Sequence, residues 1–187
     1  MDWCRNGPWR LLCAAFAAVC LAAAAPIESG AEELPPNIIL IVADDLGYGD
    51  LGVQGNPGVR TPNLDRLAAD ASRATSFYAA HAICAPSRAG LMTGRYQQRF
   101  GFEWNPGPRQ EADPAFGIPS SERTIAERLR ERGYATAAIG KWHLGYGEDQ
   151  HPLARGFDYF YGFLGEAMAF TREGRGPQTL FRGREPT

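Results

Sequence analysis

A cysteine, a proline and an arginine occur at a spacing that suits the binding of an anion beside a reactive group. Cys84 is followed by Pro86 and Arg88. Proline is favoured at the first position of a helix, so the spacing predicts a helix that begins at Pro86 with Cys84 just outside it. The N–H groups and dipole of a helix N-terminus favour an anion, and an arginine one turn later adds a fork of donors. The pattern predicts an anion site with a reactive sulfur, whereas Cys84 alone would favour a buried apolar cysteine.

Two neighbouring carboxylates, Asp44 and Asp45, follow an apolar run. The run, residues 37–42, is continuous and β-branched, which predicts a central strand buried on both faces, as in a mainly parallel sheet. In a loop after the strand, the two side chains can converge on a hard cation such as calcium or magnesium. A solvated turn that stops the strand explains the pair equally well from spacing alone.

Another pair of polar residues follows a second predicted strand, residues 134–139. Lys141 and His143 lie in the sequence Gly-Lys-Trp-His-Leu-Gly, and Lys141 is the only lysine of the chain. A compact ammonium group suits contact with an anion. Open α/β sheets bind ligands beyond the carboxyl ends of their strands, which is where this pair would lie.

The rest of the sequence predicts the helices, strands and loops that would position these residues. Thr61 followed by Pro62 predicts the start of a helix whose apolar stripe, including Leu64 and Leu67, packs on the sheet. A short strand is expected over residues 74–80 and a long loop over residues 96–119.

A second helix is predicted from a capping box that begins at Thr124, with Ile125 and Leu129 facing inward and Gly133 as the stop. We interpret the aromatic segment 155–162 as packing. His81, three residues before Cys84, is interpreted as structural, and His151 is expected in a surface loop.

Composition places the 187 residues among globular proteins, with 44% hydrophobic and 21% charged residues. The net charge of −2 gives no sign of the basic surface that binding to nucleic acid or to an anionic membrane would need. Residues 1–25 combine two arginines, an apolar run and small residues before Pro26, which predicts a secretory signal peptide and an exported protein. Its removal leaves Cys84 as the only cysteine, so the mature chain can form no internal disulfide.

Taken together, the motifs resemble those of the type I sulfatases, which are arylsulfatase-like members of the alkaline phosphatase superfamily. Residues 84–95 have the form C-x-P-S-R-A-x-L-x-T-G-R, and the Asp-Asp pair and the G-K-W-H-L-G motif also match. The resemblance covers residues 35–187. It implies an α/β fold with a mainly parallel central sheet flanked by helices, here incomplete at the C-terminus, and it implies hydrolysis of sulfate esters.

The resemblance also implies a role for each site residue. Cys84 would be oxidised by a formylglycine-generating enzyme to formylglycine, whose hydrate attacks sulfur and expels the alcohol. Asp44, Asp45 and residue 84 would bind Ca²⁺, or Mg²⁺ in its place. Lys141 and His143 would contact the sulfate of a small molecule or glycan, and Arg88 would orient the modified side chain.

Sulfatases are considerably longer, and their later metal ligands, a second lysine and a further histidine have no counterpart here. We therefore expect an N-terminal portion with a half-built metal site and doubtful activity alone. Two alternatives stay open. One is a phosphodiesterase or phosphonate monoester hydrolase of the same superfamily, and the other is a non-catalytic exported protein that keeps Cys84 as a thiol.

Overall fold

The computed structural model describes residues 34–107, 113, 115–166 and 179–187. The chain divides into two compact units, residues 1–43 and 44–187. The predicted signal peptide, residues 1–25, lies outside the described residues. Among the described residues, no helix has the length and apolar character needed to cross a membrane.

The described part of the first unit, residues 34–43, contains no helix or strand. The prediction of a buried strand over residues 37–42 is therefore wrong for this structure. Ile39 and Ile41 are both more than 80% exposed. A strand forms only when its backbone pairs with a neighbour. The apolar run encodes a preference for burial but does not by itself supply that partner.

The second unit opens with the turn η1 (Gly52–Gln54) and the helix α2 (Pro62–Asp70). The helix begins where the Thr-Pro pair predicted. The Thr61 hydroxyl does not cap it; it accepts the Gly52 N–H and donates to Asp65. Leu64 and Leu67 stay exposed, so the expected packing of this helix on the sheet is not found.

Residues 74–80, predicted as a short strand, form no strand. They lead into α3 (Cys84–Thr93), which is followed by η2 (Gln97–Phe100). Small buried residues on α3, Ala85 and Ala89, let it pack closely against the core. Gly94, with a φ of 66°, ends the helix in the left-handed conformation that glycine adopts without cost.

The capping box predicted at Thr124 is present at the start of α4 (Ile125–Arg130). The Thr124 side chain accepts the Glu127 N–H while the Glu127 carboxylate accepts the Thr124 N–H. Gly133 adopts a φ of 82° just beyond this helix. Ala126 is buried and Ile125 is 38% exposed, so the inward face differs from the predicted one.

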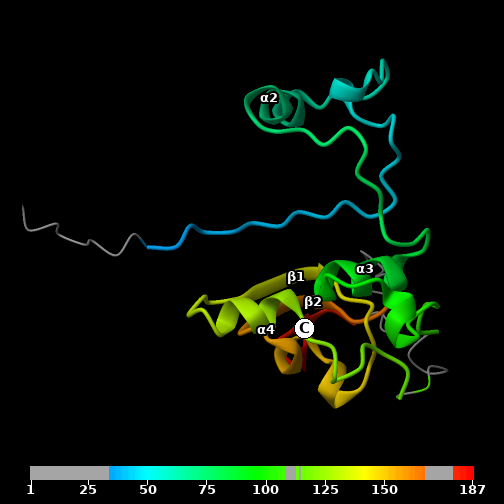
Figure 1. Ribbon diagram of the computed structural model, residues 1–187, viewed down its shortest axis with the longest axis vertical. Coiled ribbons are helices and arrows are strands. Elements are labelled where there is room, and N and C mark those ends of the chain that lie inside the picture. Colours follow the sequence, from blue (N-terminus) through cyan, green and yellow to red (C-terminus); the bar gives the residue numbers. More distant parts are fainter. Residues whose placement is uncertain (1–33, 108–112, 114, 167–178) are drawn as a thin grey trace, which may run out of the picture. The chain divides into compact units, whose positions relative to one another are not determined.

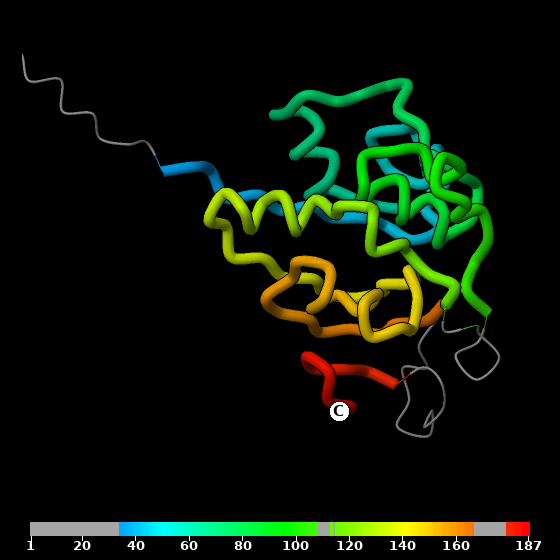
Figure 2. The backbone as a smooth tube through the Cα atoms, turned by 60° about the horizontal axis from the view of Figure 1, so that its bottom comes forward, coloured from blue at the N-terminus to red at the C-terminus, as the bar shows by residue number. Residues whose placement is uncertain are grey.

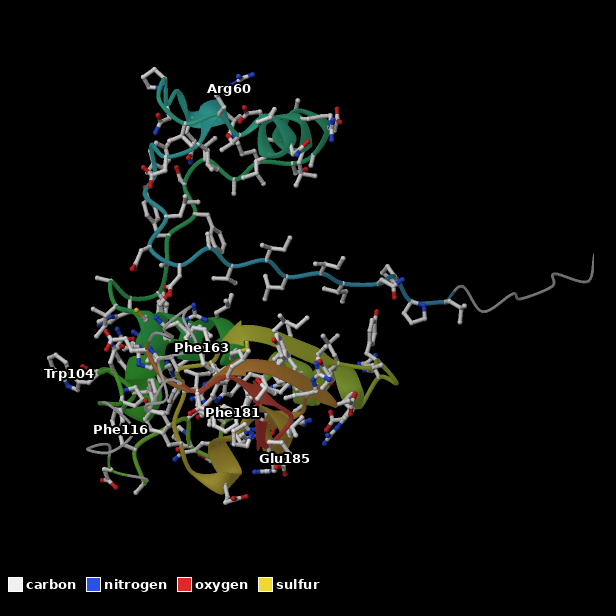
Figure 3. The ribbon with its side chains drawn as sticks, turned by 180° about the vertical axis from the view of Figure 1, so that it is seen from behind. Arg60, Trp104, Phe116, Phe163, Phe181 and Glu185 are labelled. Carbon is white, nitrogen blue, oxygen red and sulfur yellow. The ribbon has the colours of Figure 1, made fainter. Side chains whose placement is uncertain are left out.

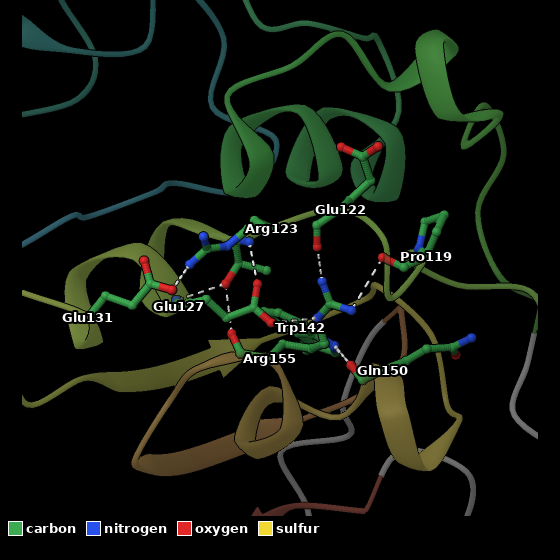
Figure 4. A network of polar contacts seen from close by, with 9 residues as sticks. Pro119, Glu122, Arg123, Glu127, Glu131, Trp142, Gln150 and Arg155 are labelled. Atoms are coloured by element: carbon green, nitrogen blue, oxygen red, sulfur yellow. Dashed lines mark hydrogen bonds and ion pairs between the residues drawn. The ribbon is translucent and has the colours of Figure 1, made fainter.

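A four-stranded sheet lies in the order β1 (Ala137–Lys141), β2 (Tyr159–Phe163), β3 (Phe181–Arg182) and β4 (Glu185–Pro186). The first pair is parallel and the other two are antiparallel, so the sheet is mixed. Helices α3 and α4 lie on the same side of the parallel pair (Figures 1 and 4). The C-terminal hairpin, red in Figure 2, continues the sheet beyond β2. The fold is thus a part of an α/β domain.

Beyond β1 the chain forms two short turns, η3 (Glu148–Gln150) and η4 (Pro152–Arg155). Residue His151 between them is buried, not on the surface as predicted, because its ring packs edge-on against Phe160. The Arg155 side chain is also buried. It donates to the carbonyls of Pro119 and Glu122, and these contacts tie the turn to the segment before α4 (Figure 4).

One hydrophobic core lies between these elements. Its buried members are Ala85, Ala89, Phe102, Ile118, Trp142, Leu144, Phe160, Leu164 and Phe181. Two of them, Trp142 and Leu144, flank His143, so the segment after β1 is held by core packing on both sides of that histidine.

Candidate active site

The two aspartates and the cysteine singled out in the sequence lie together in the second unit. One potential ligand atom from each of Asp44, Asp45 and Cys84 lies within 4.8 Å of the other two. Both aspartates are exposed and Cys84 is half-buried. Carboxylate oxygens suit calcium or magnesium, but a sulfur atom does not. The two carboxylates therefore suit a hard cation, and residue 84 would match them as a third ligand only with oxygen in place of sulfur.

The backbone at the acid pair is unusual. Asp45 has a φ of 58°, in the left-handed region that side chains other than glycine seldom adopt. His143, with a φ of 60°, is the other such residue in the described part of the chain. Conformations of this kind persist where surrounding structure holds them, and they cluster at functional sites. Both positive-φ residues belong to the predicted site.

Lys141 reaches the acid pair from the end of β1. Its Nζ lies 2.9 Å from Asp44 Oδ2, and the lysine side chain is only 8% exposed. Arg88, on the second turn of α3, donates through Nη1 to the Lys141 carbonyl at 2.8 Å. Its Nη2 lies 3.7 Å from the same Asp44 oxygen. Two cations from two elements thus meet one carboxylate.

These cations set the charge of Asp44. Partial burial alone would raise the pKa of this carboxyl group, but the hydrogen bond and charge of Lys141, together with the charge of Arg88, hold the pKa below its ordinary value. Asp44 is therefore ionised across the physiological range, as a metal ligand must be.

His143 is completely buried, and its two ring nitrogens have no hydrogen-bond partner among the described residues. Burial, followed by the charge of Lys141, lowers the pKa of His143 to about 4. The carbonyl of Pro106 opposes this shift, although it does not reach hydrogen-bond geometry with the ring. The imidazole is therefore neutral at pH 7. Buried polar atoms normally have partners, so these two nitrogens are available for a ligand.

The start of α3 differs from the prediction in one respect. The helix begins at Cys84 itself, and Pro86 is its third residue. The preceding residue, Ile83, provides no side-chain cap. The Ala85 N–H is instead bonded to Oδ1 of Asn105 at 3.0 Å. His81 has the local structural role that was predicted, because its Nδ1 accepts the Ile83 N–H.

Asn105 was not identified from the sequence. It lies in the segment predicted as a loop over residues 96–119, whose sequence has no period, and the Asn-Pro dipeptide there predicts only a turn. Nothing in the local sequence indicates a contact twenty residues back along the chain.

Five of the six predicted site residues thus form one cluster: Asp44, Asp45, Cys84, Arg88 and Lys141. The sixth, His143, feels the charges of Lys141, Arg88 and Asp44. Three segments distant in sequence meet here: the loop after residue 43, the start of α3 and the end of β1.

Comparison with known proteins gives one consistent result. The family model described as Sulfatase matches residues 36–180. The N-acetylgalactosamine-6-sulfatase of Canis lupus familiaris is 46% identical over 158 residues, which cover 82% of this chain and 29% of that protein. The steryl-sulfatase of Mus musculus is 45% identical over 180 residues, which cover 90% of this chain and 29% of that protein. The chain therefore spans about 29% of the length of these relatives.

Solved structures show the same likeness. The crystal structure of Ps i-CgsB matches with a TM-score of 0.72 and 39% identity, covering 81% of this chain and 37% of that one. The PsFucS1 sulfatase from Pseudoalteromonas sp. matches with a TM-score of 0.64 and 36% identity. That match covers 87% of this chain and 31% of the PsFucS1 chain.

Proposed function

We propose that this chain, which belongs to the sulfatase family, carries the nucleophile and part of the cation site of an enzyme that hydrolyses sulfate esters. The observation that carries the proposal is the meeting of Cys84 with Asp44, Asp45 and Lys141 in one cluster. The reaction converts a sulfate monoester and water into an alcohol and sulfate. It needs an attacking oxygen, charge compensation for the sulfate oxygens, and a proton for the leaving alkoxide.

Residue 84 would provide the attacking oxygen. As formylglycine it would supply a hydrated aldehyde, and this change from sulfur to oxygen also resolves the poor match between a thiol and a hard cation. A divalent cation held by Asp44 and Asp45 would lower the pKa of the attacking hydroxyl and polarise the sulfate. We propose calcium, with magnesium as the other candidate.

Charge balance supports a cation and an anionic substrate together. The two aspartates are offset by Lys141 and Arg88, so these four side chains carry no net formal charge. A bound divalent cation would make the cluster positive and therefore attractive to a sulfate ester. Lys141 could then turn from Asp44 toward the sulfate oxygens, while Arg88, tied to the Lys141 carbonyl, keeps its place beside residue 84.

His143 would act at the sulfate or at the leaving oxygen. In the structure it is neutral, since its pKa is about 4, and one ring nitrogen can donate a hydrogen bond. An anionic substrate would raise that pKa, which favours protonation of the ring when the ester is bound. A sulfated glycan or small molecule is the proposed substrate class.

Maturation and location follow from the same proposal. The sequence from Cys84 to Arg88 would be recognised by a formylglycine-generating enzyme. Residues 1–25 would direct export through the secretory pathway, and residues 35–187 would form the N-terminal part of the sulfatase domain.

The test is turnover of nitrophenyl sulfate and nitrophenyl phosphate by the complete gene product, produced together with a formylglycine-generating enzyme. We expect hydrolysis of the sulfate that needs added calcium or magnesium and disappears in C84A. Preference for the phosphate would instead indicate the phosphoesterase alternative. Absence of turnover of both esters by a folded, converted protein would contradict the proposal.

A further inference from the structure

We infer that Asn105 is a positioning residue that fixes residue 84 relative to His143, an inference that rests on the proposed function. The side chain of Asn105 contacts the start of α3, and the carbonyl of Gly107, two residues later, contacts Tyr146 in the segment that carries His143.

The first contact is at the start of α3. Oδ1 of Asn105 accepts the Ala85 N–H at 3.0 Å, one residue after the nucleophile position. The first N–H groups of a helix have no partner within the helix, and a preceding Ser, Thr, Asn or Asp usually supplies one. Ile83 cannot do so. Ala85 is completely buried, so water would not readily replace the amide oxygen.

The second contact is with the segment after β1. The carbonyl of Gly107, two residues after Asn105, accepts the Tyr146 hydroxyl at 3.1 Å, three residues beyond His143. The same segment therefore touches the chain on the His143 side as well as at residue 85.

The other end of the segment is fixed by packing. Phe102 is buried and stacks on Phe116 with ring centroids 5.2 Å apart. Trp104, between this anchor and Asn105, is 71% exposed and projects from the ribbon (Figure 3). Asn105 thus lies in a strap, residues 102–107, that is held at both ends, and its amide is the strap's polar link to the nucleophile helix.

Loss of the amide should release the first turn of α3 from the strap without removing any group that touches the substrate. A displacement of about 1 Å between reacting groups can cost about 10²-fold in rate. The position of residue 84 relative to the sulfate and His143 should therefore change, while sulfate binding by other groups remains. This predicts a defect in kcat and not in KM.

The test compares N105A, N105D and wild type in the complete gene product, converted at residue 84 and loaded with calcium. We expect N105A to lower kcat about 10- to 100-fold with KM within about twofold. We expect N105D to recover most of kcat, because aspartate accepts a helix N–H as well as asparagine does. N63A, on the exposed part of α2, is the matched control and should behave as wild type.

A second readout does not depend on turnover. Hydrogen exchange at the Ala85 amide should become about tenfold faster or more in N105A and stay slow in N105D. If N105A does not fold, the N105D protein decides: kcat within about threefold of wild type with a protected Ala85 amide supports the inference, and a larger loss contradicts it.

A folded N105A protein with wild-type kcat would overturn the inference, whatever its exchange rate. These results are distinct from failure of the proposed function, because that failure would appear as an inactive wild type.

Discussion

The Nζ of Lys141 lies 2.9 Å from Oδ2 of Asp44, a residue ninety-seven positions earlier in the chain. The pair joins the carboxyl end of β1 to the loop that holds both aspartates. The lysine side chain is only 8% exposed, whereas the Asp44 side chain is 42% exposed. The lysine end of this ion pair is therefore largely shielded from water, and the aspartate end is hydrated. In the proposed enzyme it defines where the cation and the sulfate meet.

Neutralising the carboxylate should abolish function. In D44N the site loses a charged ligand, and the buried ammonium of Lys141 loses its ion-pair partner. We expect kcat/KM for nitrophenyl sulfate to fall by about 10³-fold or more, with weaker calcium binding in titration calorimetry. D70N, at the end of α2 and outside the cluster, serves as the control. Wild-type calcium affinity in D44N would contradict the metal-ligand role.

Two substitutions of Lys141 should show whether activity depends on the positive charge alone or also on the compact shape of the ammonium group. K141A removes the ammonium, and we expect a loss of about 10²- to 10³-fold in kcat/KM. K141R keeps the charge but replaces a point charge with a wide planar fork in a nearly buried position, so we expect it to rescue less than a tenth of the activity. Full activity of K141R would show that only net charge matters here.

His143 should make the stability of the chain depend on pH. Its pKa is about 4 in the folded state and near 6.5 when unfolded, so between these values the unfolded state binds the additional proton. Stability should therefore decrease as pH falls from about 6.5 to about 4, by about 2 kcal/mol after allowance for solvent screening.

Urea unfolding of wild type and H143Q at pH 7 and pH 4.5 measures this effect. We expect a smaller difference between the two pH values in H143Q. Asp44 contributes in the same direction, because its lowered pKa gives stability that is lost as pH falls through the carboxyl range. Equal pH dependence of the two proteins would show that the ring is not buried neutral.

Gly162 should tolerate no side chain. It pairs with Gly140 in the parallel register, and a Cβ there would lie 1.9 Å from the Gly140 carbonyl oxygen. We expect G162A to be destabilised by about 2–4 kcal/mol, because β2 must move away from the strand that carries Lys141. G49A, where a Cβ meets nothing within 4 Å, is the control in urea unfolding. Equal stability of the two variants would contradict this register.

Short motifs, together with the family they resemble, were sufficient to select the candidate site residues. The acid pair, the cysteine, the arginine and the lysine belong to short motifs, and the structure brings them together. The capping box at Thr124 was predictable for a similar reason, since its two hydrogen bonds join residues three positions apart. Local chemistry therefore predicted the start of α4, and the resemblance was needed to choose among the interpretations of the candidate site residues.

Features that depend on distant partners were not predictable. Residues 37–42 have the pattern of a buried strand, but pattern alone does not form the pairing that a strand requires. His151 looked like a loop residue, yet Phe160 covers it. The contact of Asn105 with Ala85 depends on how a loop returns to a helix, and neither residue carries a local signal for it.

The central claim is that residue 84 is an oxidised nucleophile. Its most direct test is mass spectrometry of the tryptic peptide 74–88 from protein isolated in its native host. We predict a peptide in which an aldehyde replaces the thiol and which reacts with a hydrazide. A peptide that is fully alkylated by iodoacetamide would show that Cys84 remains a thiol and would contradict the account.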